Sequence, residues 1–132
     1  MLSHAMFSIP AIKGISFGSG FDFSNLLGSE ANDSPCIYED KVTHKTNHNG
    51  GIIGGITDGM PLIFKCAVKP TPSIKKTQET INLETMENTS LSINGRHDAA
   101  IIARIKEVIN EMTAITICDL LCTHFGTDWL RS

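Results

Sequence analysis

The sequence predicts an α+β fold in which mixed strands pack on a long C-terminal helix. Three patterns support this prediction. Residues 11–18, "AIKGISFG", alternate apolar and polar side chains as a strand does. Residues 61–70, "PLIFKCAVKP", form a second apolar run with a proline at each end, where a strand tolerates proline. Residues 99–125 repeat apolar side chains at spacings of three and four, the spacing of one helix face.

The first part of the chain alternates short elements with polar connections. Leu2 to Ile9 resembles the last turns of a helix, because Pro10 disfavours the helical conformation of the residue before it. No start signal precedes this helix, so we expect the chain to be part of a longer polypeptide. Residues 28–51 contain so few apolar side chains that we expect a long loop.

The second part leads into the long helix. The glycine-rich run "GGIIGGITDGMP" precedes the strand of residues 61–70, and residues 71–89 look like an exposed connection to a short strand at 90–93. A helix from about Ala99 to Phe125 would be about 40 Å long. Its segment "AITICDLLC" is apolar nearly all round, which predicts burial between other elements. The chain supplies too little other helix to cover it, so part of the expected core is missing.

The composition is typical of one soluble globular domain, with 132 residues, 41% of them hydrophobic and 19% charged. The apolar runs are too short to span a bilayer, and the first ten residues lack the features of a signal peptide. The cysteines show no disulfide or zinc spacing, so we expect a cytoplasmic protein. His44, His48 and His97 do not complete a metal site either.

The net charge of −3 is too acidic for a general nucleic-acid binder, yet the lysines gather between residues 41 and 76. Asp58 is the sole acidic residue of that stretch. The stretch therefore suggests either a local site for phosphate or carboxylate or an ordinary solvated lysine face. Its lysines are Lys41, Lys45, Lys65, Lys69, Lys75 and Lys76.

Three segments combine residues suited to ligand binding. The glycine-rich run could let backbone N–H groups approach a phosphate, or it could serve only tight turning and close packing. The segment "KPTPSI" stiffens Lys69, Thr71 and Ser73 with prolines, which suits a ligand contact as well as an ordinary strand exit. In "NGRHD", Arg96 could clamp an anion, whereas Asp98 could cap the helix or serve chemistry.

Taken in order, four segments resemble the C-terminal part of chorismate synthase. They run from about Ala5 to Leu121 and read "MFSIPAIKGISFGSGF", "GSEAND", "TNHNGGIIGGITDGMPLIFKCAVKPTPSI" and "NGRHDAAI". The resemblance implies a lyase of the shikimate pathway, which supplies aromatic amino acids. Such an enzyme removes phosphate from 5-enolpyruvylshikimate 3-phosphate by anti-1,4-elimination and releases chorismate.

The resemblance also implies a cofactor, an assembly and site residues. The family requires reduced FMN, forms a homotetramer and has a β-α-β sandwich fold. Asp98 would be the acidic residue near the flavin N5 that assists proton transfer. No metal is implied, and no short motif tells whether the enzyme reduces its own flavin with NADPH. The flavin contacts would be Pro10, Ala11, Gly54, Lys69, Pro70, Thr71, Pro72, Ser73 and Arg96.

The chain also departs from the family pattern. The family's N-terminal half carries a Ser-His-Gly motif, a second histidine and substrate-binding arginines that are missing here, and Ala99 and Ala100 replace a usual Pro-Cys pair. Leu27 stands where a basic residue is common. We therefore assign residues 1–132 to the C-terminal portion of a chorismate synthase domain, inactive by itself. The alternatives are a non-catalytic flavin- or phosphate-binding remnant and a structural partner of a separate N-terminal half.

Overall fold

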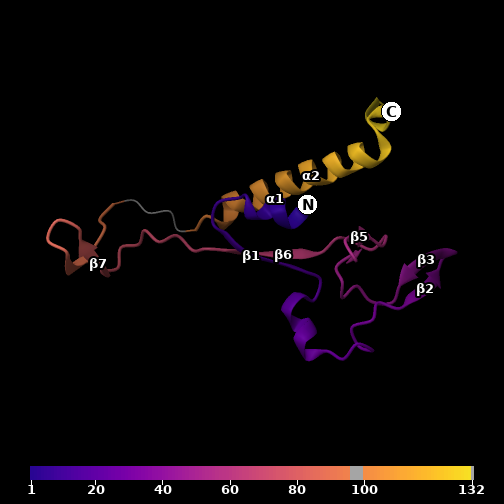
Figure 1. Cartoon of the computed structure of the whole chain (residues 1–132), viewed down its shortest axis with the longest axis horizontal. Helices are drawn as coiled ribbons and strands as arrows, with labels where there is room; N and C mark the ends of the chain where they lie inside the picture. Colours follow the sequence, from indigo (N-terminus) through magenta and orange to yellow (C-terminus); the bar gives the residue numbers. More distant parts are fainter. Residues whose placement is uncertain (96–99, 132) are drawn as a thin grey trace. The chain divides into compact units, whose positions relative to one another are not determined.

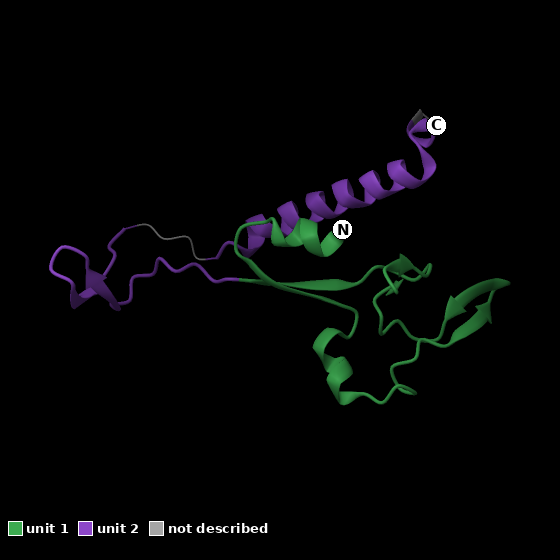
Figure 2. Ribbon diagram, viewed as in Figure 1, with its two compact units in different colours: residues 1–68 green, residues 69–132 purple. Residues whose placement is uncertain are grey.

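The computed structural model describes residues 1–95 and 100–131 of the chain. They fall into two compact units, Met1–Val68 and Lys69–Ser132 (Figure 2). The elements of the first unit are α1 (Leu2–Phe7), β1 (Ile12–Phe17), the 3₁₀ helix η1 (Gly20–Asn25), β2 (Pro35–Tyr38), β3 (Lys41–His44), β4 (Ile52–Ile53), β5 (Ile56–Thr57) and β6 (Phe64–Val68). Those of the second unit are β7 (Gln78–Asn82), β8 (Glu87–Leu91), α2 (Ile102–Phe125) and the 3₁₀ helix η2 (Asp128–Arg131).

The antiparallel pair β1–β6 joins the two ends of the first unit (Figure 1). Its register runs from Ile12 opposite Val68 to Phe17 opposite Phe64. The rings of Phe17 and Phe64 lie with their centroids 5.8 Å apart and their planes at 41°. A cross-strand aromatic pair of this kind stabilises a strand pair beyond its hydrogen bonds. The two strands predicted from the sequence are confirmed as β1 and β6.

Helix α1 packs against β1 and ends before Pro10, as the sequence predicts. Its two buried side chains, Leu2 and Met6, are four residues apart and therefore lie on one face of the helix. Ile9 and Ile12 are buried as well, and they carry the apolar character of that face into the first strand. These side chains make up the apolar core of the first unit as far as its buried residues show.

A tight turn connects α1 to β1. The backbone N–H of Ile12 donates to the carbonyl of Ile9 at 3.3 Å, so Pro10 and Ala11 are the two central residues. Proline fixes the first of them at negative φ, and Ala11 has a φ of 72°. This combination defines a type II β-turn, whose third position favours glycine or asparagine. An alanine there is strained by about 1 kcal/mol, because its Cβ crowds the backbone in the left-handed region.

The long loop predicted for residues 28–51 is wrong in part, because it contains the hairpin β2–β3. Glu39 and Asp40 connect the two strands with φ values of 50° and 59°. Two consecutive positive φ values are the mark of the type I′ turn, the commonest two-residue hairpin turn. The hairpin was missed because this turn usually carries asparagine or glycine rather than Glu-Asp.

The exposed connection predicted for residues 71–89 is likewise wrong in part, because it contains β7 and most of β8. These strands pair antiparallel from Gln78 opposite Leu91 to Asn82 opposite Glu87. The side chain of Asn82 accepts from the backbone N–H of Glu84 at 2.9 Å, which bends the chain at the hairpin loop. Of the predicted short strand at 90–93, only Ser90 and Leu91 are in a strand, as the end of β8.

Helix α2 confirms the long C-terminal helix and ends at the predicted residue, Phe125. Its apolar second half is mostly exposed, contrary to the prediction: Ile115 is 60% exposed and Leu120 is 42% exposed, whereas Thr116 is buried. The prediction failed because an apolar pattern on all sides shows that a helix needs to be covered, and it does not show whether the chain contains elements that cover it. The α+β class is confirmed, and every strand pair within residues 1–95 and 100–131 is antiparallel.

The turn at Ala11 generates a prediction about stability. Replacing Ala11 by glycine removes the Cβ that crowds the left-handed conformation, so we expect Ala11→Gly to raise the free energy of unfolding by up to about 1 kcal/mol. Ala5→Gly in α1 is the matched control and should lower it, because glycine weakens a helix. Thermal and urea unfolding measure both. A loss of stability in Ala11→Gly would show that the alanine is not strained.

Candidate functional site

The Asp33 carboxylate organises the loop of residues 46–49. Only 5% of Asp33 is exposed. Its Oδ1 accepts from the Thr46 hydroxyl at 2.7 Å and from the His48 backbone N–H at 2.8 Å. Its Oδ2 accepts from the backbone N–H and the side-chain amide of Asn49, both at 2.8 Å. One buried charge therefore takes its donors from a single short loop, and charge-assisted hydrogen bonds are the stronger kind.

These hydrogen bonds decide the ionisation of Asp33. Burial by itself would raise the pKa of the carboxyl group, but the donors from Asn49, Thr46 and His48 outweigh it and lower the pKa from 3.8 to about 2. The carboxylate is therefore ionised throughout the physiological range. Its chemistry is that of an anchor, because a group that holds its charge so firmly exchanges no proton near neutral pH.

The anchored loop in turn holds the end of β1. The carbonyl of His48 accepts from the backbone N–H of Ser19 at 2.7 Å, and the Ser19 Oγ lies 3.0 Å from Nδ1 of His48. Next to it, the N–H of Gly18 donates to the carbonyl of Ile63 at 2.9 Å. The "GSG" step, the "TNHN" loop and the strand approach to β6 therefore meet in one hydrogen-bonded cluster, which the linear sequence did not reveal.

Gly50 and Gly51 are packed against neighbouring backbone. The carbonyl of Gly50 accepts from the Ile63 N–H at 3.0 Å, and that of Gly51 accepts from the Asp58 N–H at 3.2 Å. A Cβ on Gly51 would lie 2.6 Å from the carbonyl oxygen of Pro61, closer than real Cβ atoms come. For these two glycines the interpretation of tight turning and close packing is confirmed.

Gly54 and Gly55 differ from them, because they form an open turn. They join β4 to β5, in which Ile53 pairs with Ile56, and their φ values are 59° and 83°. The turn is thus type I′. Both glycines are exposed, and nothing lies within 4 Å of a Cβ built on either of them. Their backbone N–H groups can be approached closely, as an anion or a flat ring requires.

The site residues expected from the resemblance belong to both units. Pro10, Ala11 and Gly54 lie in the first unit, and the segment Lys69 to Ser73 begins the second. Arg96 and Asp98 lie outside the described residues. The convergence of these groups on one cofactor therefore stays a prediction. Within the first unit, Ala11 has a positive φ, as Glu39 and Asp40 also have, and Gly54 has open surroundings, as Gly55 also has.

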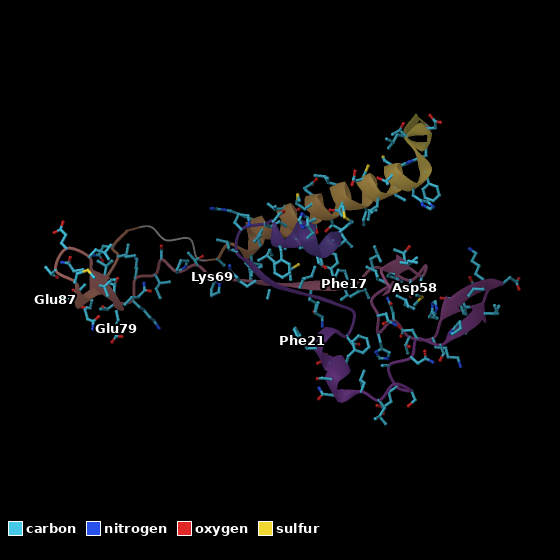
Figure 3. All side chains as sticks on the ribbon, viewed as in Figure 1. Phe17, Phe21, Asp58, Lys69, Glu79 and Glu87 are labelled. Atoms are coloured by element: carbon cyan, nitrogen blue, oxygen red, sulfur yellow. The ribbon has the colours of Figure 1, made fainter. Side chains whose placement is uncertain are left out.

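The segment from Lys69 to Ser73 presents polar groups at the start of the second unit. Lys69 is exposed (Figure 3), as is Ser73. Thr71 is half-buried, and its Oγ1 is buried without a hydrogen-bond partner among the described residues. A buried hydroxyl without a partner is uncommon and indicates a position that a ligand or solvent atom completes. This segment is thus suited to a polar ligand.

The charge pattern and the cysteines add two findings. All the lysines between residues 41 and 76 are exposed, which agrees with the solvated lysine face and leaves an anion site open. Burial raises the pKa of the Cys66 thiol, which lowers its reactivity as a nucleophile.

In the part of the chain that the structure describes, no group of three or more His, Cys, Asp or Glu side chains could hold a metal ion. None of the helices described is long and apolar enough to cross a bilayer.

The start of α2 bears on the interpretation of Asp98. The N-cap of α2 is Ile101, which makes no side-chain capping hydrogen bond. The helix thus begins later than the pattern from about Ala99 indicated. Asp98 itself lies outside the described residues, so its roles as a helix cap and as a catalytic group both stay predictions.

Comparisons with known proteins agree with these observations. The profile of the chorismate synthase family matches residues 1–122. A chorismate synthase of Dehalococcoides mccartyi is 52% identical over 119 residues, which are 90% of this chain and 33% of the relative. That of Methanocaldococcus jannaschii is 50% identical over 121 residues, which are 91% of this chain and 32% of the relative. The chain thus spans about a third of the length of the curated relatives it matches.

A solved structure is similar to the chain as well. It is a crystal structure of chorismate synthase, with a TM-score of 0.51 and 38% sequence identity. The similarity covers 55% of this chain and 22% of that one.

The Asp33 anchor generates a prediction about stability. Asp33→Asn removes the charge and turns an amide donor toward backbone N–H groups that need an acceptor. We expect the free energy of unfolding to fall by about 2–4 kcal/mol. Asp22→Asn, at an exposed aspartate of η1, is the matched control and should change it by less than about 0.5 kcal/mol. Urea unfolding measures both, and equal effects of the two substitutions would refute the anchor.

The pKa of Asp33 generates a second prediction. Because the pKa is lower in the folded chain (about 2) than its ordinary value of 3.8, the unfolded chain binds more protons between these values. The free energy of unfolding should therefore fall as the pH decreases from about 4 to about 2, by about 1–2 kcal/mol from this group after allowance for solvent screening. Asp33→Asn lacks this contribution. The difference in the free energy of unfolding between the unsubstituted chain and Asp33→Asn should therefore become smaller as the pH falls from about 4 to about 2. A difference independent of pH would contradict the assignment.

Proposed function

The chain belongs to the chorismate synthase family, and on that premise we propose that it is the C-terminal portion of an enzyme that makes chorismate. The reaction removes phosphate from 5-enolpyruvylshikimate 3-phosphate by anti-1,4-elimination, a carbon–oxygen lyase reaction of aromatic amino-acid biosynthesis. The observation that supports this proposal most strongly is the identity of about half of all residues to chorismate synthases over some nine-tenths of the chain.

Reduced FMN is the cofactor we propose, and the residues present fit it. When bound, reduced flavin supplies electron density that helps to expel the phosphate of the substrate. The open Gly54–Gly55 turn offers backbone N–H groups without a side chain in the way. The Thr71 hydroxyl has no hydrogen-bond partner among the described residues, and Lys69 is an exposed cation suited to a phosphate. Strained backbone of the kind seen at Ala11 persists mainly at ligand sites.

Each proposed contact has a stated task. Pro10 and Ala11 form the turn on which the flavin would rest, and its type II geometry directs the peptide between them in a fixed orientation. The segment Lys69 to Ser73, which includes Pro70 and Pro72, would hold the flavin phosphate or ring with little loss of entropy, because prolines restrict its backbone. Arg96 would pair bidentately with an anionic group.

Asp98 is the catalytic residue that we propose. A carboxylate beside the reacting centre can hold or pass on the proton that leaves the substrate, which is general acid–base chemistry. The support for this role is the resemblance of the segment "NGRHDAAI" to the family segment that carries the acidic residue. We also propose a homotetrameric, cytoplasmic enzyme, whose substrate is a small phosphorylated acid and not a nucleic acid.

One observation favours a second candidate, a structural piece that completes a separately encoded N-terminal half. Helix α2 exposes large apolar side chains, among them Ile102 at 63% and Phe125 at 66%. Side chains of this kind normally lie in a core or an interface. A related candidate is a non-catalytic remnant that still binds flavin or phosphate.

Two measurements test these candidates. The purified chain should form no chorismate from 5-enolpyruvylshikimate 3-phosphate and reduced FMN. Co-expression with the N-terminal two-thirds of a relative should restore it, because that portion supplies the residues the chain lacks. In the restored enzyme, Asp98→Asn should lower kcat by about 10²–10⁴-fold, whereas Asp119→Asn on α2 should change it little. Chromatography of chorismate measures both. Chorismate formation by the chain alone would overturn the requirement for the N-terminal portion, and full activity of Asp98→Asn would overturn the catalytic role of Asp98.

FMN titration distinguishes the remnant from the structural piece. Fluorescence quenching of FMN by the chain alone indicates a preserved binding module. If only the co-expressed pair quenches it, the flavin site needs both portions.

A further inference from the structure

We propose that Asp33 is a positioning residue for the Gly54–Gly55 turn, which it holds ready for the cofactor by fixing the loop that leads into β4. The inference rests on the proposed function, because it assumes that this turn meets the flavin. Asp33 itself touches no ligand in this account, since the residue is almost fully buried and its oxygens are occupied by Thr46, His48 and Asn49.

The first step of the argument is that the β4–β5 hairpin cannot hold itself. Each strand has two residues, Ile52–Ile53 and Ile56–Thr57. Isolated two-stranded hairpins are marginal in water even when they are longer. The side chains of Ile53 and Ile56, which pair across the strands, are 45% and 73% exposed and contribute little burial. The conformation of the turn must therefore be set at the base of the hairpin.

The second step is that the base is held from the loop side. At the base, the carbonyl of Gly51 accepts from the backbone N–H of Asp58, and the carbonyl of Gly50 accepts from the backbone N–H of Ile63. The N–H of Gly50 donates back to the carbonyl of Asn47 at 3.1 Å, and the Asn47 side chain donates to the carbonyl of Pro61 at 2.9 Å. Hydrogen bonds that end on residue 47 constrain Gly50 only if residue 47 is itself fixed.

The third step is that Asp33 fixes it. The donors to the carboxylate come from Thr46, His48 and Asn49, on both sides of Asn47. Residues 46 to 49 all take part in these hydrogen bonds, and Gly50 follows them directly. The position of Gly50 therefore depends on the Asp33 carboxylate. From Gly50 it passes through Gly51 to the two residues of β4 and the turn.

The Asp58 carboxylate completes the base on the other side. Its Oδ1 accepts from the Met60 N–H at 2.9 Å, which turns the chain after β5 toward Pro61. Both ends of the hairpin are therefore tied by an aspartate to backbone N–H groups. Asp33 differs from Asp58 because it acts from a segment 13 to 16 residues away and so fixes the loop in space.

The test measures the turn and flavin binding separately, in the chain itself. In Asp33→Asn, the NMR amide signals of residues 50–55 should move to unstructured positions, and the cross-strand contacts of Ile53 with Ile56 should vanish. The contacts of Ile12 with Val68 should persist. Thr46→Val removes one donor and should give a smaller change of the same kind. Phe64→Leu, which weakens the ring pair of β1–β6, is the control of comparable destabilisation and should leave residues 50–55 in place.

Flavin binding supplies the second readout. Where the unsubstituted chain quenches FMN fluorescence, Asp33→Asn should weaken binding by about 10- to 100-fold, and Phe64→Leu by less than about threefold. A native 50–55 turn in Asp33→Asn, or equal loss in both variants, overturns the inference. A chain that binds no FMN at all counts against the proposed flavin role of this portion alone, and the NMR comparison then decides the inference.

Discussion

A buried carboxylate that must keep its charge is the constraint on which the first unit depends. An ionised group taken out of water is costly unless donors replace the water, and Asp33 obtains its donors from one loop. Few conformations place two backbone N–H groups, a hydroxyl and an amide around one carboxylate. The loop of residues 46–49 therefore adopts the conformation that solvates Asp33. Ser19 and Gly50 are then placed by their hydrogen bonds to His48 and Asn47 of this loop.

The glycine-rich run shows that one motif can serve two purposes. The two interpretations considered from the sequence, close packing and approach of a ligand, apply to different glycines of the same run. Gly51 faces backbone atoms that exclude a Cβ, whereas Gly54 faces open space. The two kinds of glycine therefore have different roles. The packed Gly50 and Gly51 fix the base of the β4–β5 hairpin, and the exposed Gly54 and Gly55 leave their backbone groups accessible. Ala11 is a related case, because its positive φ forms the turn between α1 and β1, and strained backbone also clusters at functional sites.

The sequence predicted those elements whose pattern lies within the element itself. The period of α2, the proline after α1 and the prolines around β6 were sufficient to find them. The hairpins β2–β3 and β7–β8 were missed because their turns place Glu39, Asp40 and Met86 at positive φ without the glycine that usually marks such turns. The role of Asp33 could not be found either, since a side chain bonded to backbone 13 to 16 residues away leaves no periodic trace. The expected chemistry came from the resemblance, which alone singled out Ala11 and Gly54 and gave Asp98 a defined role.

The balance of polar and apolar contacts explains why such a network matters in this chain. The fully buried apolar side chains are few, and α2 leaves Ile115 at 60% and Phe125 at 66% exposed. Burying one such side chain stabilises a protein by about 1.5–3 kcal/mol, so a helix with this surface gains most of its stability from whatever covers it. The first unit reduces that dependence, because charge-assisted hydrogen bonds fix its loops without a large core. The chain spans about a third of the length of the curated relatives it matches, and our proposal is that the remaining two-thirds of the family polypeptide covers α2. The anchored loops of the first unit can then keep their shape before that cover is added.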